Sequence, residues 1–589
     1  MKILNKILIL AAIAVSAVSC DLTLLPEDEV TPKQYFATES DLALWSNKFY
    51  NYLLETADVG INDADDKIDN GLSNFIAGSR NPASESWSFS QLREINYLLE
   101  HLDQCTDRGV ALKYEAVARF FRAYFYFVKV RAYGDVPYYD HVLASNDPDL
   151  YRARDDRGYV MDKVLEDFDF AAKNLPSSWG TKSTRVTKWA ALAYASRAAL
   201  FEGTFRRYHA ATLFKNDDKN AEKAEKYLRI AADCAAEFIA SAPYSLYNTG
   251  DEPYRDLFWA DDAKTTEVVL CRRYDAGAGV THSVPQSINF GRTSLTRGFI
   301  NHYLMADGSS FTDKSKRDYD KMFYTEVAKN RDPRMAQTVL CPGYKMVGAS
   351  TVTRSKLYSH TGYEPIKFLS TAAKANPGAG TSDWICMRAA EVYLNYAEAL
   401  AELGTLTQND LDISVNKIRK RAGMPDLKMA DANANPDPYL VDYYKNVTKS
   451  ANTGVILEIR RERTVELVME PPYRSWDLFR WKEAKLALNT VRPWEGVYIP
   501  GDGTYDMDGN GKDDLEIYSD TPKSTCETKL KIGSDIIVNK NGYIEGYSEN
   551  KYGTNWDDER DYLWPIPASQ RVLNHNLTQN PGYQDGLSF

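Results

Sequence analysis

The sequence predicts a mainly α-helical fold, in which four helical hairpins form a scaffold and a large, irregular, loop-rich half carries short strands. Three observations support this prediction. Amphipathic segments with apolar residues at helical spacing recur in pairs along the chain. The long stretches between them are rich in glycine, serine, threonine, tyrosine and arginine, which favours irregular structure. The chain has 589 residues, of which 44% are hydrophobic, so it can bury a large core.

The N-terminus has the features of an exported lipoprotein. Two lysines precede an apolar stretch over residues 7–18, which is shorter than the ~20 residues that span a bilayer. Small residues then lead directly into Cys20, in an arrangement that resembles a bacterial lipobox. We therefore expect residues 1–19 to be removed as a signal peptide and Cys20 to carry acyl chains, which together form a durable anchor. Ordinary secretion with a free N-terminal cysteine is the alternative.

The first hairpin is expected near residues 113–176. Its first segment, 113–131, repeats apolar side chains at helical spacing, and Gly134 followed by Pro137 ends it. Its second segment, 158–176, is amphipathic and stops at a proline. The two segments together predict an antiparallel helix pair with a long connection.

The second and third hairpins are expected near residues 186–241 and 385–425. The second pairs an alanine-rich segment, which ends in Gly203, with another amphipathic segment. The third pairs two segments that are followed by Gly404 and Gly423, where glycine commonly ends a helix. Units of about 34 residues or somewhat more resemble tetratricopeptide helix pairs.

The fourth helical block is expected near residues 456–489. Four glutamates spaced four residues apart alternate there with arginines: Glu458, Glu462, Glu466, Glu470, Arg460, Arg461 and Arg463. Spacing of this kind predicts a solvated helix with salt bridges along its surface. A catalytic pair of carboxylates is the alternative.

Three irregular regions, residues 61–90, 242–384 and 490–561, are too long to be simple linkers, and long ordered loops are usually functional. The last one contains alternating oxygen donors around Gly511, as in loops that bind Ca²⁺. Ile517 stands where an EF-hand has a glutamate, so this is not an EF-hand. We expect a structural Ca²⁺, with an acidic glycine-rich turn as the alternative, and no organic cofactor. The expected ligands are Asp506, Asp508, Asn510, Asp514 and the carbonyl of Lys512.

Composition excludes several classes of function. The formal net charge is −11 and no basic patch is present, so nucleic acid is not an expected partner. Phosphate-binding loops, nucleophile elbows and H-E-x-x-H motifs are absent from the sequence. The six cysteines after Cys20 show no C-x-x-C spacing, and we expect them to be small buried apolar residues.

Seven sequence blocks, in order, resemble one known family. They are "ESWSFSQLREINYLLE" (85–100), "EAVARFFRAYFYFVKVRAYGDVPYY" (115–139), "RDPRM" (331–335), "RAAEVYLNYAEALAELG", "VNKIRKRAGMP", "RRERTVELVMEPPYRSWDLFRW" and "YLWPIP…NHNLTQNPGY". Together they are similar to the SusD/RagB family of outer-membrane nutrient-binding lipoproteins. The resemblance covers essentially the whole chain after the signal peptide.

The resemblance implies a single domain over residues 20–589, with a tether and first helix in 20–60 and four tetratricopeptide-like hairpins cradling the irregular regions. It implies a protein without enzyme activity, anchored through Cys20 on the outer face of the outer membrane. Such a protein captures oligosaccharides, or peptides in some members, and delivers them to a SusC-like TonB-dependent transporter.

The resemblance also places ligand residues in two segments, one before the first framework tryptophan and one in the middle region. Candidates with suitable chemistry are Asp69, Asn70, Phe75, Arg80 and Asn81 in the first, and Tyr274, His282, Gln286, Asn289, Phe290 and Arg292 in the second. Packing or capping within a loop is the alternative role for each residue. Trp259, Trp384, Trp494 and Trp556 are further candidates, as platforms on which a sugar ring stacks.

Two functions of other classes remain open. A glycoside hydrolase would need two carboxylates about 5 to 9.5 Å apart in a cleft, and no motif singles out such a pair. A scaffold that binds only protein is the other, and the large share of aromatic loop outside the helix pairs disfavours it.

Overall fold

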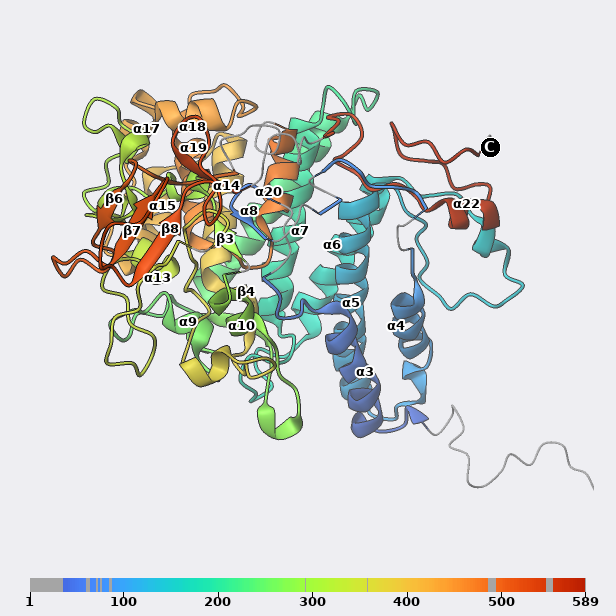
Figure 1. Cartoon of the computed structure of the whole chain (residues 1–589). Helices are drawn as coiled ribbons and strands as arrows, with labels where there is room; N and C mark the ends of the chain where they lie inside the picture. The colour runs from blue at the N-terminus through green and yellow to red at the C-terminus, as the bar shows by residue number, and fades with distance from the viewer. Residues whose placement is uncertain are drawn as a thin grey trace, which may run out of the picture.

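A computed structural model describes residues 35–59, 64–69, 73–74, 77–83, 87–291, 293–357, 359–485, 494–546 and 555–587. The chain is mainly helical with small, scattered sheets, as the sequence predicts (Figure 1). The α-helices are α3 (Glu39–Leu53), α4 (Ser90–Glu100), α5 (Arg108–Tyr133), α6 (Arg157–Asn174), α7 (Lys188–Tyr208), α8 (Asn220–Ser241), α9 (Asp256–Trp259), α10 (Val284–Asn289), α11 (Arg297–Ile300), α12 (Tyr324–Val327), α13 (Pro333–Thr338), α14 (Ala389–Leu403), α15 (Gln408–Asp412), α16 (Val415–Arg421), α17 (Met429–Ala434), α18 (Pro438–Tyr443), α19 (Thr453–Glu466), α20 (Arg474–Arg480) and α22 (Ala568–Leu573).

The first two predicted hairpins form a continuous helical array. Helix α5 packs on α6, α6 on α7, and α7 on α8, and these helices stand side by side in Figure 1. Capping side chains set where they begin. The Asp107 carboxylate accepts hydrogen bonds from the backbone N–H groups of Gly109 and Val110 at the start of α5, and Thr187 accepts one from Ala190 at the start of α7. At the other end of α5, Gly134 has a φ of +74°, so the chain leaves the helix in a conformation that favours glycine.

Helix α7 continues past Gly203, where the sequence pattern predicts its end. A Cβ atom at this glycine would lie 2.8 Å from the Cγ atom of Leu228 on α8. Gly203 therefore permits the close approach of α7 and α8 and does not terminate a helix.

The later helices differ more from the predictions. The segment expected as a helix over 385–404 begins as strand β4 (Trp384–Arg388), and α14 starts only at Ala389. The partner segment is divided into α15 and α16, and the block at 456–489 gives α19 and the short α20, while residues 486–489 lie outside the described residues. Helix α14 packs on α8 and α19, and α20 packs on α7, so these helices extend the array. Gly404, as predicted, ends α14 with a φ of +78°.

The irregular half carries short strands, in agreement with the sequence. The strands are β1 (Lys67–Ile68), β2 (Val268–Arg272), β3 (Ser294–Leu295), β4, β5 (Glu495–Tyr498), β6 (Gly503–Tyr505), β7 (Leu515–Tyr518), β8 (Thr528–Lys531) and β9 (Tyr543–Glu545). Antiparallel pairs join β1 with β3, β2 with β4, and β5 with β9. Strand β7 lies between β6, to which it is antiparallel, and β8, to which it is parallel.

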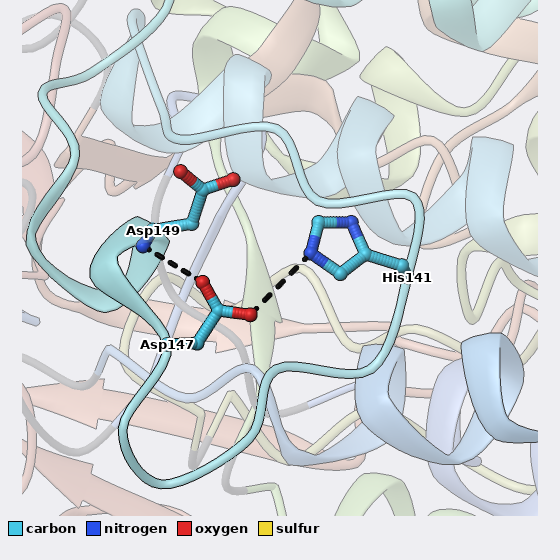
Figure 2. A group of neighbouring side chains, drawn as sticks. All are labelled: His141, Asp147 and Asp149. Carbon is cyan, nitrogen blue, oxygen red and sulfur yellow. Dashed lines mark hydrogen bonds and ion pairs between the residues drawn. The ribbon is translucent and has the colours of Figure 1, made fainter.

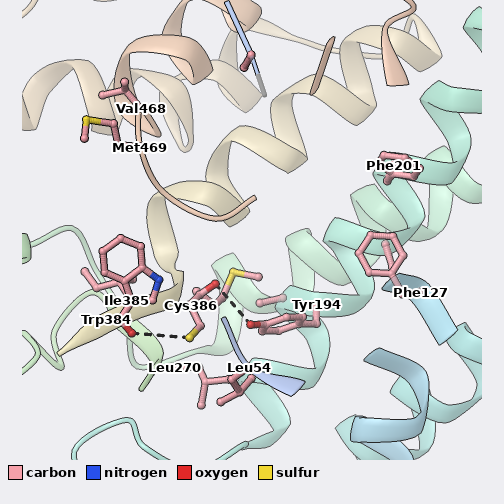
Figure 3. Close-up of a cluster of buried hydrophobic side chains, with 14 of the residues drawn as sticks. Leu54, Phe127, Tyr194, Phe201, Leu270, Trp384, Ile385, Cys386, Val468 and Met469 are labelled. Carbon is pink, nitrogen blue, oxygen red and sulfur yellow. Dashed lines mark hydrogen bonds between the residues drawn. The ribbon is translucent and has the colours of Figure 1, made fainter. Parts of the chain in front are cut away.

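The core continues from the helical array into the β2–β4 sheet. Figure 3 shows Tyr194 of α7 directed at the segment of β4 that contains Trp384, Ile385 and Cys386. The Tyr194 hydroxyl donates to the carbonyl of Cys386 at 3.5 Å, and the Trp384 ring stacks on Phe368 at 5.1 Å. The scaffold and the irregular half therefore share one hydrophobic core.

Most of the glutamate and arginine ladder on α19 is buried, and only Glu458 is half-buried, which corrects the prediction of a solvated helix. Arg460, Arg463 and Glu466 are all 2% exposed or less. Their partners come from distant segments. The Arg388 guanidinium, for example, contacts Glu267 at 2.8 Å and Glu466 at 2.7 Å. Spacing along the sequence predicts ion pairs between neighbours on the helix surface. Tertiary packing instead pairs these residues with distant segments inside the protein.

The cysteines follow the expectation of buried apolar residues. Cys105, Cys271, Cys341 and Cys386 are buried and Cys234 and Cys526 are half-buried, and within the described ranges all six are free thiols. Burial raises the pKa of the Cys234 thiol to about 12, which keeps that thiol neutral. None of the helices in the described part of the chain has the length and apolarity needed to cross a membrane.

Candidate functional site

Three segments that are distant in sequence meet at one place in the irregular half. Strand β1 pairs with β3, which places the chain around residues 64–69 beside residues 293–295. Leu295 also forms a β-bridge with Tyr363, which brings residues 359–364 to the same place. Backbone pairing therefore joins both segments with predicted ligand residues to a third segment, which belongs to the irregular region 242–384 but in which no ligand residue was predicted.

A cavity of 380 Å³ lies beside this junction, and we call it the Phe290 pocket. Phe290 directly follows α10, and its side chain is 60% exposed. An exposed aromatic ring in a concave site is a usual feature of a ligand pocket. The lining residues are Ile288, Asn289, Phe290, Gly291, Leu340, Tyr344, Met346, Thr353, Arg354, Lys356, Ser359, Glu364, Pro365 and Leu369.

Glu364 gives the Phe290 pocket a titratable group. Burial raises the pKa of the Glu364 carboxyl to about 7, although the Ser355 hydroxyl donates a hydrogen bond to it at 3.1 Å. At neutral pH this carboxyl is therefore present in both its acid and its ionised form. It can donate or accept a hydrogen bond with a ligand hydroxyl, and Arg354 and Lys356 offer further donors on the same wall.

The structure brings only some of the predicted ligand residues together. Asn289 and Phe290 line the pocket, and Gln286 lies half-buried on the adjoining α10. Tyr274 and His282 instead belong to the core: the Tyr274 hydroxyl accepts a hydrogen bond from the backbone N–H of Ala57 at 2.9 Å.

His282 also has a structural role, since its Nε2 atom lies 3.1 Å from the carbonyl of Ser382 and its ring packs edge-to-face on Tyr274. Of the candidates in the first predicted segment, Arg80 is buried against Asp561. Asn81 accepts a hydrogen bond from the N–H of Ala83. Asp69 is half-buried and stays a candidate, because its charge acts on His360 at the edge of the junction. Asn70, Phe75 and Arg292 lie outside the described residues.

Sequence reasoning missed the residues between 340 and 369 that complete the pocket. Arg354, Lys356 and Glu364 follow no motif, and only tertiary pairing brings them beside Phe290. Three of the four tryptophans that were candidates for stacking on a sugar are buried: Trp384, Trp494 and Trp556 are each 6% exposed or less. Trp259 is half-buried, and its indole N–H donates to Asp256 at 2.9 Å.

The predicted calcium loop connects β6 to β7. Carboxylate oxygens of Asp506, Asp508 and Asp514 lie within 4.8 Å of one another, which suits a hard cation by donor type. Backbone N–H groups of the loop already donate hydrogen bonds to one of these carboxylates. Asp506 accepts hydrogen bonds from the N–H groups of Gly509 at 2.8 Å and Gly511 at 2.7 Å.

The Arg354 guanidinium links the calcium loop to the Phe290 pocket. Its Nε atom donates to the Asp508 carboxylate at 2.7 Å and lies 3.5 Å from Asp514. Asn510, another expected ligand, accepts a hydrogen bond at its side-chain oxygen from the N–H of Lys512 at 2.8 Å. The acidic loop is therefore shaped by local hydrogen bonds and partly neutralised by an arginine.

A second group with metal-ligand chemistry was not predicted. His141, Asp147 and Asp149 bring one ligand atom each to within 4.8 Å of the others, on the connection between α5 and α6. Figure 2 shows the Asp147 carboxylate between the His141 ring and the backbone N–H of Asp149. Asp147 thus caps the short 3₁₀ turn Pro148–Tyr151 and leaves only part of its carboxylate for other contacts.

Comparisons with known proteins agree on one family. A model of the SusD family matches residues 266–583, which is more than half of the chain, and a model described as "starch-binding associating with outer membrane" matches residues 77–200. The SusD-like protein P2 of Formosa agariphila is 22% identical over 96% of this chain and 96% of its own length.

Solved structures show the same fold. A SusD-like protein of Bacteroides fragilis superposes with a TM-score of 0.67 and 22% identity, over 95% of this chain and all of the other. A SusD-like carbohydrate-binding protein of the same species gives a TM-score of 0.64 and 19% identity, over 92% and 100%. A structure with a xylogluco-oligosaccharide gives 0.57 and 17%, over 95% and 99%. The chain therefore belongs to the SusD family, whose proteins bind their ligands without catalysing a reaction.

Proposed function

We propose that this protein captures an oligosaccharide at the cell surface through the Phe290 pocket and delivers it to a SusC-like TonB-dependent transporter in the outer membrane. The observation that carries the ligand proposal is the exposed Phe290 ring, which lies in a cavity that also contains amide, hydroxyl, carboxyl and cationic groups. Sugar rings present C–H faces to aromatic rings and hydroxyls to such polar groups.

Similar proteins support the choice of a glycan. One solved relative is described as carbohydrate-binding, and another contains a xylogluco-oligosaccharide. The pocket adds a physical reason, since Asn289, Ser359 and Thr353 are short neutral side chains that can pair with hydroxyls without a charged ligand. A peptide ligand is the second candidate, favoured by the charges of Arg354, Lys356 and Glu364 on the same walls.

A binding screen with matched variants tests the ligand proposal. The protein, produced from residue 21 without its lipid, is run against polysaccharides and peptides by affinity electrophoresis and calorimetry. We expect binding to one glycan class with no released product. Replacing Phe290 by alanine should weaken that binding about fivefold, because an aromatic contact contributes about 1 kcal/mol. Leu44→Ala removes a similarly exposed apolar side chain on α3 and should leave the affinity unchanged.

The outcomes separate the alternatives. Binding to a peptide and to no glycan would move the function to peptide uptake. Release of a sugar product would contradict the absence of catalysis and revive the glycoside hydrolase. A glycan affinity that Phe290→Ala leaves unchanged would place the site elsewhere.

The proposed location rests on the N-terminal sequence, which lies outside the described residues, and on a family model whose description names the outer membrane. Lipidation of Cys20 would tether the domain beside its transporter. Cys20→Ser should therefore release the protein from the outer-membrane fraction, while glycan binding by the purified domain stays unchanged. A Cys20→Ser protein that remains in the membrane fraction would contradict the anchor.

We also propose that the β6–β7 loop holds a structural Ca²⁺ through Asp506, Asp508 and Asp514, with Asn510 and the Lys512 carbonyl as further oxygen donors. The spacing of the carboxylates and the oxygen-only donor set support this role.

A further inference from the structure

A second cavity, of 540 Å³, lies away from the Phe290 pocket. It is formed where the start of α4 meets the α5–α6 connection and α22, and we call it the α4–α22 cavity. In Figure 1, α4 and α22 lie at the right, on the side opposite β6, β7 and β8, while α10, which carries the Phe290 pocket, lies left of centre. The two cavities share no lining residue and therefore lie in different parts of the molecule.

The wall of this cavity contains a buried acceptor without a donor. Asn96 of α4 is 1% exposed, and its Nδ2 atom donates to the carbonyls of Tyr139 at 3.1 Å and His141 at 3.0 Å. These two hydrogen bonds fix the orientation of the amide. Among the residues that the structure describes, its Oδ1 atom then has no hydrogen-bond partner, although such buried atoms are normally paired. This oxygen has almost no accessible surface, so a ligand hydroxyl would reach it only after a small shift of the cavity wall, of which Asn96 is part.

The apolar part of the cavity contains leucines, among them the exposed Leu150 and Leu573, and aromatic side chains, of which Trp87 and Tyr151 are two. Tyr151 is 58% exposed, and within the described residues its ring contacts no other aromatic ring. Trp87 is half-buried and held in place by Tyr133, whose ring lies edge-to-face at 4.8 Å, and by Phe89 at 5.4 Å. The cavity thus has one fixed and one exposed ring face, both suited to packing against the C–H face of a sugar.

Further polar groups come from the other walls. The Gln570 side chain on α22 has no hydrogen-bond partner among the residues that the structure describes, so both its donor and its acceptor are available. Arg93 uses one Nη atom to donate to the carbonyl of Leu143 at 2.6 Å and keeps its other N–H groups. Acceptors and donors beside ring faces match a ligand rich in hydroxyls.

We propose that the α4–α22 cavity is a second saccharide-binding site, in which a sugar ring packs on Trp87 and Tyr151 and a sugar hydroxyl donates to Oδ1 of Asn96. Its volume lies within the ~300–1,000 Å³ typical of small-molecule sites. Two separate sites would let one protein hold a long glycan at two points, or bind two chains at once.

Crystals of the Phe290→Ala variant provide the test, because the first pocket is weakened in them. They are soaked separately with maltose, cellobiose, lactose, xylobiose, mannobiose and chitobiose. We expect at least one disaccharide in the α4–α22 cavity, with a hydroxyl within hydrogen-bond distance of Asn96 Oδ1. In solution, Tyr151→Ala and Gln570→Ala should each weaken binding of that disaccharide about tenfold.

Tyr52→Ala is the matched control, because Tyr52 is 59% exposed on α3 and does not line the cavity. It should leave the affinity unchanged. Tyr151 is exposed and Gln570 is half-buried, so neither substitution removes a core side chain and both variants should fold. The proposal is overturned if no disaccharide enters the α4–α22 cavity or if only a water molecule is bound to Asn96 Oδ1. It is equally overturned if a protein segment, and no sugar, fills the cavity. It is also overturned if binding survives both substitutions.

Discussion

Glu364 shows how a single residue can couple the pocket to pH. Its carboxyl lies on the wall of the Phe290 pocket with a pKa that burial raises from an ordinary 4.5 to about 7. A group with a raised folded pKa contributes stability that is fully present below its unfolded pKa, since the folded state then binds the proton more tightly. This contribution is lost as the pH rises through the folded pKa.

We therefore expect the free energy of unfolding to fall between about pH 4.5 and pH 7, and Glu364→Gln to remove about 1 to 3 kcal/mol of this fall. Urea unfolding at a series of pH values measures it. Glu483 must be considered too, because burial raises its pKa to about 7 as well, so the variant is needed to isolate Glu364. Glu222→Gln, at an exposed position of α8, is the control. Identical pH profiles for wild type and Glu364→Gln would contradict the assignment.

At the scale of elements, the calcium loop can be tested without knowledge of the glycan. If Ca²⁺ binds between β6 and β7, a concentration a hundredfold above its Kd should stabilise the protein by about 2.7 kcal/mol. Thermal unfolding with Ca²⁺ and with EDTA measures this effect. Asp506→Asn should abolish it, and Asp520→Asn, at an exposed site outside the loop, should not.

Arg354 gives a second readout of the same loop. Its guanidinium neutralises Asp508, so Arg354→Ala should raise the affinity for Ca²⁺ by removing a competing positive charge. No stabilisation of the wild type by Ca²⁺, or equal stabilisation of Asp506→Asn, would leave the loop as an acidic turn held by hydrogen bonds and Arg354.

The elements also show what sequence can predict. Helices α5 to α8 were predicted to within a few residues because periodicity and capping are local properties. Strand β4 was predicted as helix because a short continuous run of apolar residues is compatible with a buried strand and with a buried helix. In the site, the exposed Phe290 was found, but Glu364 and Arg354 were not, because their approach depends on pairing between residues 295 and 363.

At the scale of the whole molecule, buried ion pairs connect the helical array to the irregular half. Glu466 of α19 contacts Arg388 at 2.7 Å and Arg334 at 3.0 Å, and it also pairs with Arg421 of α16. Burial alone would raise the pKa of Glu466, but these three arginines outweigh burial and hold the pKa well below its usual range. One carboxylate therefore joins α13, α16 and β4 to α19.

Removing that charge tests whether the network holds the fold together. Glu466→Gln leaves three buried arginines with less compensation, and breaking a buried pair in this way typically costs about 3–5 kcal/mol. We expect a loss of that size in urea unfolding, in one transition that reports both halves, since they share a core. The control is Glu225→Gln, which removes an i,i+4 pair with Arg229 whose side chains are 52% and 59% exposed, and should change stability by less than about 0.5 kcal/mol. Equal effects of the two substitutions would mean that the buried network adds no more than a surface pair. Two separate transitions in Glu466→Gln would instead show that this carboxylate couples two units able to unfold independently.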